Sequence, residues 1–175
     1  LAGRLCAREA LRLLHGEAGV PTRGEDGAPQ WPPGVVGSIT HGAGLAAALV
    51  AHARDWQGLG LDVEKQLSAT RAAKLAGEIL TPAELERASG LQPEAFARLV
   101  TLTFSLKESL FKALYPLVRQ RFYFHDAELL NWDEDGRARL RLLIDLSSDW
   151  PTGSELDGQF AELDGYLLSL LGVAA

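Results

Sequence analysis

The feature that most constrains the fold is a long segment between Pro93 and Pro116 that contains neither glycine nor a further proline. Its residues are mostly good helix formers, so we expect one helix that starts at Pro93 and ends at Pro116. One side of this helix is broad and apolar, and it comprises Phe104, Leu106, Leu110, Phe111 and Leu114. The rest of the chain must supply a surface on which this side is buried.

Two charged residues of this segment, Glu108 and Lys112, stand one helical turn apart, so their side chains share a face. Taken alone, the pair is typical of an exposed ion pair that contributes a few tenths of a kcal/mol. A functional role for Glu108 and Lys112 therefore needs support from other parts of the sequence.

The composition is that of a globular protein, with 175 residues, 47% hydrophobic and 23% charged. This length suffices for one domain or for two small halves packed together. The single cysteine, Cys6, excludes an internal disulfide framework and a cysteine-cluster metal site, and it fits a reducing, cytoplasmic setting. A net charge of −6 argues against nucleic-acid binding. We expect no membrane contact, because the longest apolar run, 43–53, is short and contains His52, and no signal peptide is visible.

The order of expected elements is helix, strands, helices, strands, which favours an α+β fold over a parallel βαβ sheet. We expect helices over 2–15, 69–78, 81–89 and 93–116, with a loop over 19–34. The third of these helices starts with a capping-box pattern, Thr81-Pro82-Ala83-Glu84. We expect strands over 35–41, 45–52, 59–64, 122–131, 137–146, 158–163 and 166–173. The alanines of 45–52 also allow a short helix. Asp135-Gly136 and Asp164-Gly165 are typical of hairpin turns.

Two acidic residues, Asp62 and Glu64, alternate with apolar residues in the expected strand 59–64, so both carboxylates point to one face. Adjacent carboxylates repel each other and resist burial unless a cation compensates them. Hard divalent cations such as Mg²⁺ prefer such oxygen ligands. The simpler interpretation is the solvated face of an edge strand, neutralised by Lys65.

A second polar group, Thr40 and His41, ends the expected strand 35–41 just before Gly42 and Gly44. A hydroxyl, an imidazole and free backbone N–H groups near a glycine-rich turn can form a phosphate-binding site. The simpler interpretation is a turn with an incidental histidine.

Three segments occur in order along the chain: G-S-I-T-H at 37–41, G-L-D-V-E at 60–64 and F-S-L-K-E-S-L-F-K at 104–112. Together they resemble the 4′-phosphopantetheinyl transferase family, whose signatures are G-(apolar)-D-(I/V)-E and (F/W)-(S/C)-x-K-E-(A/S)-x-x-K. The W-P-P-G run at 31–34 is similar to the subgroup that serves enterobactin and other siderophore synthetases. The resemblance covers residues 4–114, and the C-terminal third is similar only in its strand-rich pattern.

The resemblance implies an α+β pseudo-dimer, in which two similar halves form one monomeric chain. We expect an N-terminal half at 1–58 that binds coenzyme A and a C-terminal half at 59–175 that carries the metal ligands and the catalytic helix. Because the chain contains no methionine and begins at Leu1, we also expect that the N-terminal half is incomplete.

The resemblance also implies roles for individual residues. Asp62, Glu64 and Glu108 would bind Mg²⁺ or Mn²⁺, which would also hold the pyrophosphate of coenzyme A. Contacts to coenzyme A would come from Arg4, Thr40, His41, Lys107 and Lys112. Arg4 and His41 would contact its 3′-phosphate. Many relatives have Gly-Lys-Pro where this chain has Gly27-Ala28-Pro29, so a lysine contact is absent or is supplied by another residue such as Arg23.

The implied activity is transfer of 4′-phosphopantetheine from coenzyme A to a serine of an acyl or peptidyl carrier protein, with release of 3′,5′-ADP. Glu108 and Lys112 would be catalytic, Glu108 as the base and Lys112 by stabilising charge on the phosphates. Arg119 and Arg121 are candidates for docking the carrier, although a solvated basic turn is the simpler interpretation. Two alternatives stay open: an Mg²⁺-dependent nucleotide or polyphosphate hydrolase, and a degenerate relative that binds coenzyme A without turnover.

Overall fold

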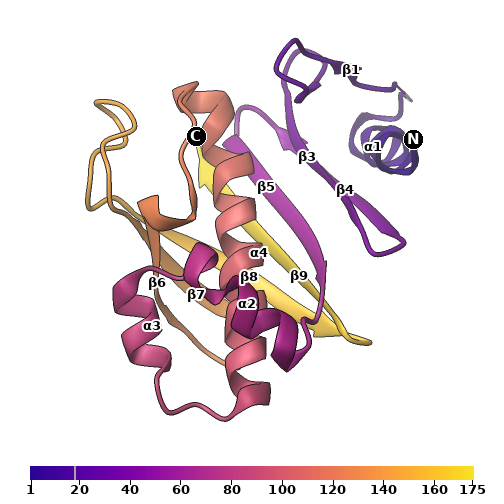
Figure 1. The fold of residues 1–175 in the computed structure, drawn as a ribbon. Coiled ribbons are helices and arrows are strands. Elements are labelled where there is room, and N and C mark those ends of the chain that lie inside the picture. Colours follow the sequence, from indigo (N-terminus) through magenta and orange to yellow (C-terminus); the bar gives the residue numbers. More distant parts are fainter. Residues whose placement is uncertain (18) are drawn as a thin grey trace.

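Helix α4 (Pro93–Val118) lies across one face of a five-stranded sheet, and together they form the main core (Figure 1). The structure is a computed structural model, which describes residues 1–17 and 19–175. The strand order is β5-β9-β8-β7-β6, and neighbouring strands are antiparallel. The strands are β5 (Trp56–Lys65), β6 (Ala127–Trp132), β7 (Arg137–Leu142), β8 (Glu155–Leu163) and β9 (Tyr166–Ala174). The predicted α+β class is confirmed.

The apolar side of α4 is buried as its pattern predicts. Leu106, Leu110 and Leu114 are fully buried against the sheet, where they join a cluster that includes Leu140 and Leu171. Burying side chains of this size stabilises the fold by about 1.5–3 kcal/mol each. This packing fixes α4 on the sheet, and with it the charged residues that α4 carries.

A smaller unit precedes the sheet in the chain and lies beside β5 (Figure 1). It consists of α1 (Ala2–His15), which packs on the hairpin of β3 (Val35–Gly42) and β4 (Leu45–His52). The packing is close, because a Cβ at Gly3 would lie 2.5 Å from the Ile39 side chain. Thus each part of the chain packs a helix on antiparallel strands, in line with the expected two-halved architecture.

Two short helices, α2 (Ala69–Ile79) and α3 (Pro82–Ala88), connect β5 to α4. The predicted capping box at the start of α3 is present: the Thr81 side chain accepts from the Glu84 backbone N–H, and the Glu84 carboxylate accepts from the Thr81 backbone N–H. A second apolar cluster, which includes Ala72, Ile79 and Val100, joins α2 to α4.

Several predicted boundaries differ from the structure. Helix α4 continues through Pro116 to Val118, because a proline this close to a helix end removes only one backbone hydrogen bond. The expected loop 19–34 contains a short hairpin, β1 (Thr22–Arg23) with β2 (Pro29–Gln30). The expected strand 122–131 is instead a 3₁₀ turn, η1 (Phe124–Asp126), followed by β6, while β7 ends four residues early and β8 begins three residues early.

No helix in the part of the chain that the structure describes has both the length and the apolar character needed to cross a membrane.

Candidate active site

The site is organised by an unusually close approach between β5 and α4, which two glycines permit. A Cβ at Gly60 would overlap the backbone carbonyl oxygen of Ser109, and one at Gly58 would overlap that of Ala113. Further along, the Leu67 N–H donates to the Thr101 hydroxyl at 3.1 Å. Residues 58, 60 and 67 therefore lie against residues 113, 109 and 101 of α4, in that order. Because the first set of numbers rises while the second falls, β5 and α4 run antiparallel, and their backbones are in contact at the two glycines.

This register brings together the acidic residues of the two segments 60–64 and 104–112. Asp62 and Glu64 lie on the same strand face as Gly58 and Gly60, and this face is covered by α4. On α4, Glu108 directly precedes Ser109, and Lys112 directly precedes Ala113. Both charged residues therefore lie next to the positions at which α4 contacts β5. The predicted clustering of Asp62, Glu64, Glu108 and Lys112 at one place is what this geometry produces.

Lys112 is bound to β5 rather than to its neighbour on the helix. Its ammonium group donates to the Leu61 backbone carbonyl at 2.8 Å and lies 3.4 Å from Asp62 Oδ1. The ion pairs found among the described residues do not include Glu108 with Lys112. The simple interpretation of an exposed i,i+4 pair is therefore wrong, and Glu108 is left without an ammonium partner.

The three carboxylates carry more negative charge than one ammonium group can offset. Burial, and next the Asp62 carboxylate, raise the pKa of Glu64 to about 8. Burial also raises the pKa of Asp62, against the opposing effect of Lys112, and burial and then Asp62 raise that of Glu108. Asp62 Oδ2 is buried and has no hydrogen-bond partner. An orphaned carboxylate oxygen of this kind is costly unless a cation compensates it.

These observations test whether a divalent cation suits the site. The donors are hard carboxylate oxygens, one of them orphaned, and burial, joined at Glu64 and Glu108 by repulsion from Asp62, raises their pKa values. Within the described residues, no three His, Cys, Asp or Glu side chains are already arranged to hold a metal ion. The donor set fits a hard cation by its chemistry, and the side chains would have to turn toward one another to ligate it.

The raised pKa values predict how pH affects the stability of the metal-free protein. Folding favours the protonated carboxyls, so stability falls as pH rises from the ordinary carboxyl range, near 4.5, through the folded pKa of about 8 for Glu64. We expect D62N to flatten this fall and to raise the melting temperature at alkaline pH by several degrees. Thermal unfolding at several pH values, with chelator present, measures the effect.

The matched control is E94Q, which removes an exposed carboxylate at the start of the same helix. It should leave the pH dependence as in the parent chain. An identical fall in stability for D62N and the parent would show that the Asp62 carboxylate does not contribute to the pH dependence.

A basic cavity of about 620 Å³ lies beside the small N-terminal unit. It is lined by Arg4 from α1, Arg23 from β1 and His41 from β3, together with Gly27 and Pro29. Arg4 and His41, both expected to contact the 3′-phosphate, therefore line one cavity. Arg23 joins them from the segment in which the expected lysine is missing.

Thr40 does not fit the role expected of it. Its side chain is buried, and its hydroxyl accepts a hydrogen bond from the Val63 backbone N–H at 3.1 Å, as Ser38 does from Leu61 at 3.0 Å. Successive strand residues point to opposite faces, so His41 faces the cavity while Thr40 faces β5. The expected contact of Thr40 with coenzyme A is corrected to a structural role, that of joining β3 to β5.

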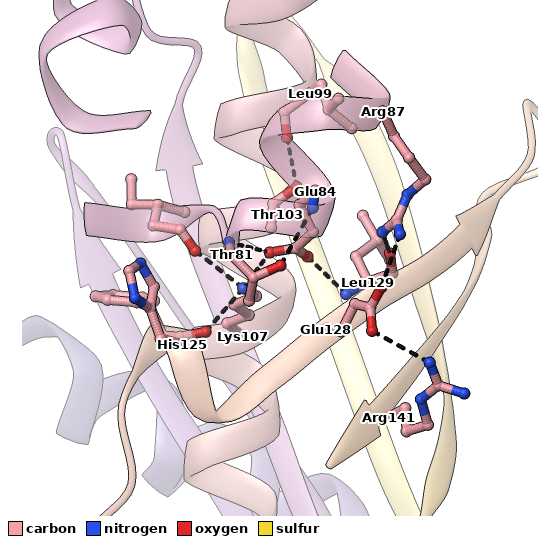
Figure 2. A network of polar contacts seen from close by, with 12 residues as sticks. Thr81, Glu84, Arg87, Leu99, Thr103, Lys107, His125, Glu128, Leu129 and Arg141 are labelled. Atoms are coloured by element: carbon pink, nitrogen blue, oxygen red, sulfur yellow. Dashed lines mark hydrogen bonds and ion pairs between the residues drawn. The ribbon is translucent and has the colours of Figure 1, made fainter. Parts of the chain in front are cut away.

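Lys107 also differs from its expected role. Its side chain is only 2% exposed and its ammonium group bonds to Ile79 O, Glu84 Oε1 and Phe124 O, as Figure 2 shows. An ammonium group has three N–H donors, and all three are used. The expected contact of Lys107 with coenzyme A is therefore corrected: no donor is free for a phosphate.

Three cavities between the basic end of the site and Glu108 share lining residues, each with the next, and we refer to them as a run of cavities. The basic cavity shares Pro29 and Ile39 with a cavity of about 300 Å³ that Lys112 and Phe111 also line. Phe111 and Glu108 in turn line a third cavity, of about 200 Å³. The two apolar cavities could not be predicted from the sequence, because their walls come from segments that only the fold brings together.

Comparisons with known proteins agree with this geometry. The model for the 4'-phosphopantetheinyl transferase N-terminal domain matches residues 1–51, and that for the 4'-phosphopantetheinyl transferase superfamily matches residues 58–170. The chain is 37% identical to the 4'-phosphopantetheinyl transferase Svp of Streptomyces mobaraensis, over 98% of this chain and 70% of the relative. It is 41% identical to enterobactin synthase component D of Escherichia coli O157:H7, over 77% of this chain and 61% of the relative.

Among solved structures, the holo-ACP-synthase from Plasmodium yoelii superposes with a TM-score of 0.50 at 18% identity, over 69% of this chain and 95% of that one. This similarity concerns the fold. The chain spans 61–70% of the length of Svp and enterobactin synthase component D.

Proposed function

Since the chain belongs to the 4′-phosphopantetheinyl transferase superfamily, we propose that it transfers 4′-phosphopantetheine from coenzyme A to a serine of an acyl or peptidyl carrier protein. The serine oxygen forms a bond to the phosphorus of the phosphopantetheine group. The pyrophosphate bond of coenzyme A breaks, 3′,5′-ADP leaves, and the serine proton passes to a base.

The observation that carries this proposal is the run of three cavities from Arg4 and His41, past Lys112, to Glu108. Coenzyme A is long, with a phosphorylated nucleotide at one end, a pyrophosphate in the middle and an apolar arm. A basic cavity followed by a lysine and then by apolar cavities matches this order of chemical groups. Glu108 lines the third cavity, and Asp62 adjoins the run through its contact with Lys112 at 3.4 Å.

The chain's own residues would divide the chemistry among them. Lys112 would stabilise negative charge on the pyrophosphate, and its bond to Leu61 O holds it at β5. Glu108, half-buried and with a raised pKa, is the candidate base for the serine proton. Asp62, Glu64 and Glu108 would hold Mg²⁺ or Mn²⁺, which supplies charge neutralisation and orients the phosphates when it is bound.

We further propose that the chain works as a monomer, because both basic and acidic parts of the site come from one chain. Its single cysteine suits the reducing cytoplasm, where carrier proteins would be met. The division into a half at 1–58 that binds coenzyme A and a half at 59–175 that carries the carboxylates is part of the same proposal.

One assay separates the candidate functions: the chain is incubated with coenzyme A, Mg²⁺ and an apo carrier protein, and the carrier is weighed by mass spectrometry. A gain of one phosphopantetheine group supports transfer. Cleavage of coenzyme A with an unlabelled carrier supports the hydrolase, and binding without cleavage supports the degenerate relative.

The basic cavity gives a prediction about substrate choice. R4A and H41A should each raise KM for coenzyme A by about tenfold or more, because each removes a charge-assisted contact to the 3′-phosphate. The same variants should use dephospho-coenzyme A, which lacks this phosphate, as well as the parent does. The measurement is KM for both substrates.

The control is R8A, which removes an exposed arginine of the same helix that does not line the cavity. An equal loss with both substrates in R4A and H41A would place the 3′-phosphate elsewhere.

A further inference from the structure

A buried ion pair adjoins the site but takes no part in the chemistry described above. Lys107 follows Leu106 and precedes Glu108 on α4, yet its side chain runs away from the carboxylates. It ends 2.6 Å from Glu84 Oε1, 2.9 Å from Ile79 O and 2.8 Å from Phe124 O (Figure 2). These three acceptors belong to three different segments: α3, the end of α2, and η1.

Glu84 uses its carboxylate as fully as Lys107 uses its ammonium group. Its Oε1 also accepts from the Thr81 backbone N–H at 2.8 Å, and its Oε2 accepts from the Leu129 backbone N–H at 2.7 Å. Both side chains are almost completely buried. Glu84 and Lys107 therefore tie α4 to the backbone of α3 and of the edge strand β6, and through Phe124 to η1.

The Phe124 contact is the one that reaches the active site. Residues 121–124 form one wall of the cavity of about 200 Å³, and Lys107, Glu108 and Phe111 of α4 line it as well. The rings of this wall pack on α4, since Phe122 lies against Phe111 and Phe124 stacks on Phe104. Among the described residues, its backbone hydrogen bonds other than the one from Lys107 to Phe124 O are local. The Tyr123 N–H donates to Asp126 Oδ2 at 2.8 Å and the Asp126 N–H to Tyr123 O at 2.9 Å, and both bonds stay within the turn.

We propose that Glu84 and Lys107 are positioning residues that hold the wall at 121–124 against α4 and so set the width of the cavity beside Glu108. The consequence for turnover rests on the proposed function, since the cavity would receive the part of the substrate next to the reacting phosphate. Glu84 does not line this cavity, and the Lys107 ammonium group, which uses its three donors on Ile79 O, Glu84 Oε1 and Phe124 O, has none left for the substrate. A buried ion pair adds little net stability compared with apolar residues of similar size, so a role in stability alone does not require these charges.

The test replaces both residues, because a single replacement would leave one buried charge unpaired. The variants are E84L/K107M and E84Q/K107M, the second of which keeps an amide oxygen for the Thr81 or Leu129 N–H. Both should retain the circular dichroism of the parent. Hydrogen exchange at the Tyr123 and Asp126 amides should become about tenfold faster, while exchange at Leu106 and Leu110 stays unchanged. KM for coenzyme A or for the carrier should rise about tenfold, with kcat within about threefold.

The matched control is E128Q, which alters a buried carboxylate of the same network. Glu128 accepts from Arg87 at 2.7 Å and from Arg141 at 3.2 Å (Figure 2), and among the described residues no recorded hydrogen bond joins it to 121–124. It should leave exchange at Tyr123 and Asp126 and both KM values as in the parent.

Unchanged exchange at Tyr123 and Asp126 in a folded double variant would overturn the proposal, as would unchanged KM values in an active one. If the parent chain transfers nothing, the proposed function fails, and hydrogen exchange alone then decides whether the pair holds the wall.

Discussion

Replacing Glu108 with glutamine is expected to lower the rate of phosphopantetheine transfer by about a thousandfold or more. The side chain has two assigned tasks, as a base for the serine proton and as a ligand for the cation, and an amide performs neither well. The fold should survive, since burial already raises the pKa of this carboxyl and a neutral group suits its surroundings better. Single-turnover rates with saturating coenzyme A and carrier measure the loss.

E94Q on the same helix serves as the control, because Glu94 is exposed at the first turn of α4, far along the helix from Glu108. If the melting temperature of E108Q equals or exceeds that of the parent, the lower transfer rate of E108Q is not caused by unfolding. Transfer by E108Q at a tenth of the parent rate or faster would remove Glu108 from both assigned tasks.

Replacing Gly60 with alanine is expected to destabilise the chain by about 3 kcal/mol or more, and to abolish transfer by the fraction that stays folded. The new methyl group would overlap the Ser109 carbonyl oxygen, which is backbone and cannot move without shifting α4. A shift of α4 separates Glu108 and Lys112 from Asp62. Urea denaturation followed by circular dichroism measures the change in the free energy of unfolding.

G77A is the matched control, because Gly77 lies inside α2 and a Cβ there meets no atom within 4 Å. Alanine at this helical position should be neutral or stabilising by up to about 1 kcal/mol. If G60A unfolded at the same urea concentration as G77A, the close approach of β5 and α4 would not be what positions the site.

Much of the architecture could be predicted because local patterns and tertiary packing agree. The apolar side of α4, the capping box at Thr81 and the Asp164-Gly165 turn all appear where their patterns place them. At Asp164 and Gly165 the backbone has positive φ values of 50° and 79°, as a tight hairpin turn requires. Boundaries were less predictable, since Pro116 is tolerated in the last turn of α4.

The candidate site was predictable in its residue types but not in its contacts. Lys107 and Glu108 are adjacent in sequence, yet a helix turns by about 100° per residue, so they face different surroundings. Thr40 and His41 point to opposite faces of β3 for the analogous reason in a strand. Lys112 pairs with Asp62 because β5 packs directly against α4. The i,i+4 spacing between Glu108 and Lys112 could not predict Asp62 as the partner of Lys112.

Glu84 shows a different limit of sequence reasoning. Its place in the capping box was visible, but that pattern explains only its bond to the Thr81 N–H. Its partners Lys107 and Leu129 lie 23 and 45 residues away in the chain, and no local pattern links them.

The central claim is that this run of cavities and carboxylates transfers phosphopantetheine, and the mass of the carrier tests it most directly. An apo carrier protein, incubated with the chain, coenzyme A and Mg²⁺, should gain the mass of one phosphopantetheine group on a single serine. It should gain nothing with E108Q or when chelator replaces Mg²⁺. A carrier whose mass is unchanged in the presence of the folded parent chain, across acyl and peptidyl carriers, would contradict the claim.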